Sequence, residues 1–151
     1  LSEFVDKLID KILYNYDKYS KIIDIEHVKA SLTYKQHKKY DLLRTLFWIN
    51  SIKIKQKCNS EYHTLVYIYK YNDPSLEQES KQKFFSNLLR EIKEETGTKL
   101  MLIPLAGDND IQSIDLLMKK YNVTEFPTIL IDENIKLTDI GTKEEVEKYL
   151  T

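Results

Sequence analysis

Residues 121–131 read Tyr-Asn-Val-Thr-Glu-Phe-Pro-Thr-Ile-Leu-Ile, and this stretch decides the fold that the sequence predicts. Tyr121 closes an apolar pattern with helical spacing that begins at Asp110, which we expect to cap the helix. The β-branched run Thr128–Asp132 is typical of a buried strand. Pro127 therefore stands between the end of a helix and the start of a strand.

Upstream, strand and helix patterns alternate. The run HTLVYIY over 63–69 predicts a buried strand, and Lys99–Leu105 predicts a second one. Between them, Asp73-Pro74 offers an N-cap followed by proline at the first helical position, and Gly97 ends the helix. The predicted inward side chains of this helix are Phe84, Phe85, Leu88, Leu89 and Ile92.

Downstream, Ile135–Thr138 predicts a fourth strand after the turn at Glu133-Asn134. The last helix opens at Gly141-Thr142, where Thr142 and Glu145 have the spacing of a capping box. The order is β-α-β-α-β-β-α, which places a parallel pair of strands before a hairpin. We therefore expect a three-layer α/β sandwich with helices on both faces of the sheet.

The N-terminal part of the chain reads as helical. Apolar residues recur every three or four positions over residues 2–22, and Thr33 with Gln36 fits the capping box of a second helix. This second helix carries Tyr40, Leu43, Leu46, Phe47 and Asn50. We predict a two-helix extension over residues 1–57 and an α/β domain over residues 58–151.

Charge follows the same division, although the net charge of the whole chain is only −1. Residues 29–57 hold eight basic residues and one acid, whereas residues 58–151 hold 11 basic and 17 acidic residues. An even mixture of charges would not produce this asymmetry, so it supports two units that meet near Cys58.

The order of elements and the stretch Tyr121–Ile131 resemble the thioredoxin-like superfamily. The resemblance covers about residues 60–151 and implies a cis peptide bond before Pro127. It also implies that Phe126, Pro127 and Thr128 lie where that superfamily receives an extended substrate segment. A lone Pro-Thr would mean little, and the bland alternative is that Pro127 only starts an edge strand or shapes a turn.

The sequence departs from this family at the residues that carry its chemistry. The stretch that matches the Cys-x-x-Cys of thioredoxins reads Asn72-Asp73-Pro74-Ser75, and no cysteine lies between Asn59 and Thr151. Without two thiols there is no mixed disulfide and no resolving step. Dithiol oxidoreductase chemistry is therefore excluded for this chain as given, and we expect a redox-inactive member.

Other chemistries find little support in the residues. Cys58 precedes the first strand and so belongs at the end of the sheet opposite to the family's active site. The histidines are scattered without metal-ligand spacing, and no nucleotide-binding or hydrolase motif occurs. We therefore predict no catalytic residues, no metal and no cofactor.

A basic patch on the second helix is a separate candidate for binding. Its members are Lys35, Lys38, Lys39, Lys53, Lys55 and Lys57. Such lysines attract the phosphates of anionic lipids or nucleic acids. The competing interpretation is that they are solvated or balanced by the acidic domain. We place contact with a membrane surface second to that interpretation, and nucleic acid third because arginine-based base readout is absent.

The sequence thus predicts a protein-binding or peptide-binding module whose groove runs between Asn72–Ser75 and Phe126–Thr128. Two alternatives stay open: thiol chemistry completed by a partner's cysteine or by Cys58, and contact of the basic segment with an anionic surface. No apolar run approaches the length of a membrane span, so we expect a soluble domain. The numbering begins at Leu1, so an upstream signal or anchor stays open, as do the compartment and the oligomeric state.

Overall fold

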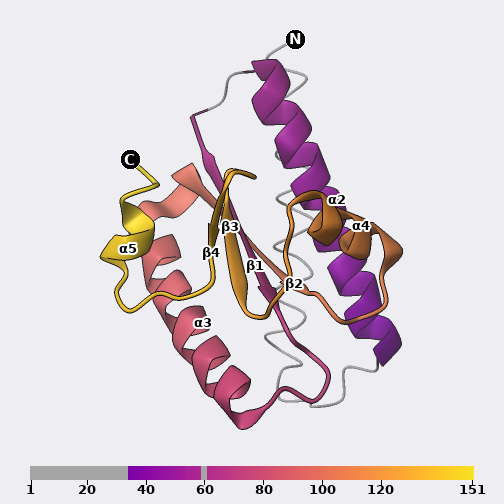
Figure 1. The fold of residues 1–151 in the computed structure, drawn as a ribbon. Helices are drawn as coiled ribbons and strands as arrows, with labels where there is room; N and C mark the ends of the chain where they lie inside the picture. The colour runs from indigo at the N-terminus through magenta and orange to yellow at the C-terminus, as the bar shows by residue number, and fades with distance from the viewer. Residues whose placement is uncertain (1–33, 59–60) are drawn as a thin grey trace. The chain divides into compact units, whose positions relative to one another are not determined.

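The computed structural model describes residues 34–58 and 61–151 (Figure 1). The chain divides into two compact units, Leu1–Ser60 and Glu61–Thr151. In the first unit, the described part is the helix α2, Tyr34–Cys58. The predicted helix over residues 2–22 and the predicted cap at Thr33 lie outside the described residues.

The second unit follows the predicted order of strands and helices. Its elements are β1 (His63–Tyr69), α3 (Leu76–Thr96), a 3₁₀ turn (Gly97–Lys99), β2 (Leu100–Ala106), α4 (Gln112–Lys120), β3 (Thr128–Ile131), β4 (Ile135–Leu137) and α5 (Glu144–Glu147). The predicted strand ends differ from these bounds by no more than one residue. The fold is mixed α/β, with four α-helices and one four-stranded sheet in the described residues.

The sheet has the strand order β2-β1-β3-β4. β1 runs parallel to β2, with His63 opposite Leu100 and Tyr69 opposite Ala106. β3 runs antiparallel to both β1 and β4, so the predicted parallel pair followed by a hairpin is confirmed. Pro104 lies on β2 at the edge of the sheet, where the missing N–H removes no interior ladder bond.

Two helices cover one face of this sheet and α4 covers the other, as Figure 1 shows for α3 and α5 against α4. Alternation along β1 sends Leu65 and Tyr67 into the core beneath α3, while Val66 and Ile68 point to the opposite face. The core on the α3 side is Leu65, Tyr67, Phe85, Leu88, Leu89, Ile92, Leu100, Ile129, Ile131, Ile140 and Val146.

The predicted start of α3 is wrong by two residues. Ser75, not Asp73, is the N-cap: its hydroxyl accepts from the Gln78 N–H, and the Gln78 side chain accepts from the Ser75 N–H. This reciprocal pair satisfies two helix-end donors at once, which a lone aspartate cap cannot do. Asp73 instead takes a left-handed conformation, with φ of 49°. The predicted stop at Gly97 is confirmed, with φ of 66°.

Two other predicted caps are also wrong. Asp110 has φ of 55°, and α4 begins at Gln112 after Ile111, without a side-chain cap. At α5 the Glu145 carboxylate accepts from the Gly141 N–H at 3.2 Å, so it does not form a capping box with Thr142.

Phe84 was predicted to face inward, yet it is 45% exposed. Phe85, Leu88, Leu89 and Ile92 already have the spacing of one helical stripe and fill the contact with the sheet. Phe84 lies beside this stripe, at the border of the buried surface.

Candidate functional site

The predicted turn after β1 is held in place by Asp108, which follows β2. One carboxylate oxygen of Asp108 accepts from the Tyr71 N–H at 2.7 Å, and the other accepts from the Asn72 N–H at 2.8 Å. The Asn72 side-chain amide donates back to the Asp108 carbonyl at 2.9 Å. Lys70 lies 3.8 Å from the same carboxylate. Asn72 is therefore a structural tie between the loops that follow β1 and β2.

The end of β1 is also fixed to α3. The Gln82 side chain accepts from the Lys70 N–H at 2.7 Å and donates to the Lys70 carbonyl at 3.1 Å. The Tyr67 hydroxyl donates to the Gln82 carbonyl at 3.1 Å. Burial raises the pKa of Tyr67 to about 12, although a hydrogen bond with Ser86 acts in the opposite direction. The end of β1 and the following Lys70, which lead into the turn, are consequently held against α3 by three hydrogen bonds.

The helix end that follows the turn is partly occupied by its own residues. The capping box engages the N–H groups of Ser75 and Gln78, so the amides of Leu76 and Glu77 are the donors left at this end. Glu77 and Glu79 add negative charge to the first turn. Leu76 is 81% exposed. The N-terminus of α3 is therefore unfavourable for binding an anion, whereas an apolar group could contact Leu76.

Phe126 and Pro127 form the second half of the predicted site. The peptide bond between them is cis. The Phe126 ring lies over Gly107 so closely that a Cβ on Gly107 would be 2.7 Å from Phe126 Cζ and 2.9 Å from Ile68 Cγ2. Pro127 and Thr128 are buried, and Phe126 is partly exposed. The close approach at this point thus requires glycine at position 107.

The main chain at Phe126 has free hydrogen-bonding capacity. The Thr128 hydroxyl donates to the Glu125 carbonyl at 2.6 Å, and Thr128 pairs with Ile68 in the sheet. Within the described residues, the N–H and carbonyl of Phe126 have no hydrogen-bond partner. A partly exposed segment that enters a strand with open main-chain groups can accept an extended chain.

The two halves of the predicted site are joined through Gly107 and Asp108. Asp108 binds Asn72, and Phe126 packs on Gly107, whose N–H donates to the Tyr69 carbonyl at 2.9 Å. No hydrogen bond in the described part of the chain links Asn72–Ser75 directly to Phe126–Thr128. Sequence reasoning missed Asp108 because a loop aspartate looks the same whether it caps a helix or ties two loops together.

A second polar cluster lies at the opposite end of β1. His63 Nδ1 is 2.6 Å from Asp132 Oδ2, and the other oxygen of Asp132 accepts from the Thr64 N–H at 3.0 Å. The Thr64 hydroxyl donates to Glu133 at 2.6 Å. His63 is thus a strand-end residue, at the first position of the strand predicted over 63–69. In residues 34–58 and 61–151 no group of three or more His, Cys, Asp or Glu side chains could hold a metal ion.

The basic patch lies on α2, which carries six lysines and Arg44 against a single acid, Asp41. Lys39, Lys53 and Lys57 are exposed. Between these lysines, Leu42 is 48% and Leu46 is 55% exposed. Cys58 is exposed at the last residue of the helix, and it is the chain's only thiol.

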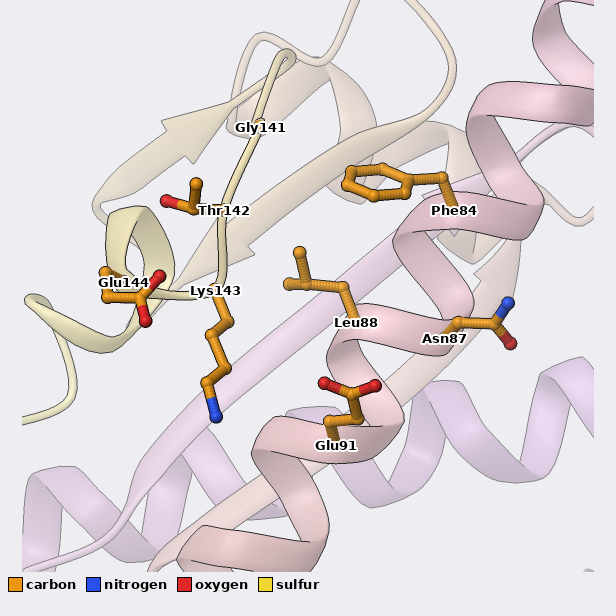
Figure 2. A pocket seen from close by; sticks show the side chains of 8 residues that line it. All are labelled: Phe84, Asn87, Leu88, Glu91, Gly141, Thr142, Lys143 and Glu144. Atoms are coloured by element: carbon orange, nitrogen blue, oxygen red, sulfur yellow. The ribbon is translucent and has the colours of Figure 1, made fainter.

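A cavity of about 380 Å³ lies elsewhere, between α3 and the segment Gly141–Glu144 (Figure 2). Phe84, Leu88 and Glu91 approach it from α3. On the other side, Lys143 Nζ lies 2.6 Å from Glu95 Oε1. That hydrogen bond raises the pKa of Lys143 and lowers the pKa of Glu95. None of the seven predicted groove residues lines this cavity. Its only sequence signal is the helical spacing of its α3 residues.

The interpretation of the candidate site depends on the geometry described above. No protein-family model and no curated protein matches the chain. Among the described residues, no helix has both the length and the apolar character needed to cross a membrane.

Proposed function

We propose that residues 61–151 are a redox-inactive, thioredoxin-like domain that binds an extended segment of a partner protein. The sheet order β2-β1-β3-β4, in which β3 alone runs opposite to the other three strands, supports the proposed family. The complete absence of cysteine after Cys58 supports binding in place of dithiol chemistry.

One observation carries the proposal: Phe126, two residues before β3, has a main-chain N–H and a carbonyl without a hydrogen-bond partner among the described residues. An extended peptide laid along this segment would form two main-chain hydrogen bonds, as in strand addition. The Phe126 ring adds an apolar surface. Tyr71, 36% exposed, and Leu76 supply further apolar contact on the turn that Asp108 ties to the same end of the sheet.

The proposal can be tested by selecting binders from a phage-displayed library of linear seven-residue peptides. We expect peptides with apolar residues to bind the full chain, and Phe126→Asp to abolish their binding. Thr124→Asp is the matched control, because Thr124 is exposed on the same segment and receives the same charge. Circular dichroism establishes whether each variant is folded. Enriched peptides that bind folded Phe126→Asp as tightly as the wild type would remove this groove from consideration.

The basic helix favours a second candidate, binding to an anionic lipid surface. Exposed Leu42 and Leu46 share one face of α2 with exposed Lys39, Lys53 and Lys57, so apolar and cationic side chains would meet a bilayer surface together. Sedimentation with vesicles containing 30% phosphatidylserine would test it. We expect binding that falls as salt rises and that is lost in Leu42→Ser/Leu46→Ser. Equal binding to neutral vesicles, or an unchanged double variant, would contradict this candidate.

A further inference from the structure

The cavity beside α3 combines an apolar wall with unbalanced negative charge. Phe84 and Leu88 stand one helical turn apart on α3 and point toward the Gly141–Glu144 segment in Figure 2. A volume of about 380 Å³ is at the small end of the range of ligand pockets, roughly 300–1,000 Å³. The cavity therefore has room for one side chain or a small molecule.

The aromatic wall is available for a cation. Phe84 is 45% exposed, whereas its neighbour Phe85 is buried with Lys81 Nζ 5.6 Å from its ring centre. Lys81 thus lies over Phe85, and no cation lies over the Phe84 ring among the described residues. An exposed aromatic ring attracts an ammonium or guanidinium group through its electron-rich face.

The charges that line the cavity favour the same class of ligand. Its one lining cation, Lys143, is already paired with Glu95. Glu91 and Glu144 also line the cavity, and neither carboxylate has a hydrogen bond or a short ion pair among the described residues. The charge of Glu144 does help to raise the pKa of Lys143, after the larger effect of Glu95. Carboxylates also lie close together beside the cavity: the pKa of Glu147 is raised by desolvation and then by its hydrogen bond with Glu95. An incoming cation would relieve this excess, and an incoming anion would worsen it.

We propose that this cavity binds the cationic side chain of a lysine or arginine from a partner protein. The aliphatic stem packs on Phe84 and Leu88, and the charged end approaches the carboxylates of the lining, Glu91 on α3 and Glu144 on α5. The site shares no residue with the proposed peptide groove, so the two proposals stand or fall independently.

A nuclear magnetic resonance titration of the full chain tests this proposal. The probe is Nα-acetyl-lysine N-methylamide, and its neutral analogue is Nα-acetyl-norleucine N-methylamide. We expect saturable amide shifts over Gly141–Glu144 with the lysine compound only. The variant Glu91→Gln/Glu144→Gln should weaken binding at least fivefold, because it removes both negative charges that line the cavity. The control Glu79→Gln/Glu94→Gln changes the net charge equally at exposed positions of α3 and should leave the affinity unchanged.

Three results would overturn the proposal: no saturable shift, equal shifts with the norleucine compound, or an unchanged affinity in Glu91→Gln/Glu144→Gln. Phe126→Asp serves as a further control, because it removes binding at the peptide groove and should not alter this titration. Equal loss of affinity in Glu91→Gln/Glu144→Gln and in the control Glu79→Gln/Glu94→Gln would indicate non-specific attraction to the acidic domain. That result would also contradict a defined site.

Discussion

At the scale of single residues, Asp108 organises the loops at the end of the sheet. Its carboxylate accepts two main-chain N–H groups, from Tyr71 and Asn72. Hydrogen bonds to a charged acceptor contribute more than neutral ones, but these donors are exposed to water, so we expect Asp108→Ala to lower the free energy of unfolding by about 1–3 kcal/mol. Urea unfolding measures this change. Asp139→Ala is the control, since Asp139 is 90% exposed and 4.0 Å from Lys81; equal effects would contradict the tie.

Gly107 offers a matched pair of substitutions with Gly141. In Gly107→Ala the new methyl group would approach Phe126 and Ile68 below ordinary contact distance, so one of these side chains must move. Overpacking of this kind costs about 1–3 kcal/mol. In Gly141→Ala the nearest atom is Glu145 Oε1 at 3.5 Å, which is ordinary contact. Thermal unfolding should show a clear loss for position 107 and little change for position 141. Similar midpoints would refute the close packing of Phe126.

At the scale of elements, helix caps separate what the sequence could predict from what it could not. The strands were predictable because a strand that is buried on both faces must be apolar on both faces. A continuous apolar run such as 63–69 shows this pattern within a few residues. The start of α3 was missed, because Asp73 and Ser75 are both good cap residues. The sequence signal that decides between them is the capping-box spacing of Ser75 and Gln78. The cavity beside Phe84 was out of reach, since it depends on how a distant segment returns over α3.

The same capping box gives a prediction for α3. Ser75→Ala removes the acceptor of the Gln78 N–H, so the free energy of unfolding should fall by about 1 kcal/mol. Ser80→Ala is the control, because Ser80 is exposed inside the helix, where alanine is the better helix former. Chemical unfolding followed by circular dichroism compares the two variants. A loss of equal size at both positions would contradict the assigned N-cap.

At the scale of the whole molecule, charge is unevenly divided, because residues 1–60 hold 12 basic and 7 acidic residues and residues 61–151 hold 11 and 17. The acidic unit still presents the cavity beside α3 and the loops around Phe126 as separate surfaces. Its stability rests on a sheet whose central strand, β1, is tied at one end by Asp132 and at the other by Gln82 and Asp108. Both proposed binding sites therefore lie around a sheet whose strand β1 is held by hydrogen bonds at each end.

Alkaline pH tests how firmly that central strand is buried, through Tyr67. The pKa of Tyr67 is about 12 in the folded protein because its ring is buried, against about 10 in an unfolded chain. As pH rises above 10, the unfolded state loses this proton first. The contribution of Tyr67 to the free energy of unfolding is therefore fully present below pH 10 and falls until the pH passes 12. At pH 11 the loss should be about 1 kcal/mol.

Tyr67→Phe isolates this effect from the titration of the other tyrosines and lysines. At pH 8 the variant should be less stable than the wild type by about 1 kcal/mol, because it lacks the hydrogen bond to the Gln82 carbonyl. This difference should shrink toward zero by pH 11, since only the wild type carries the buried phenol. Urea unfolding at pH 8, 9, 10 and 11 measures it. A difference that stays constant over this range would mean that Tyr67 titrates equally in both states and that β1 is not buried as described.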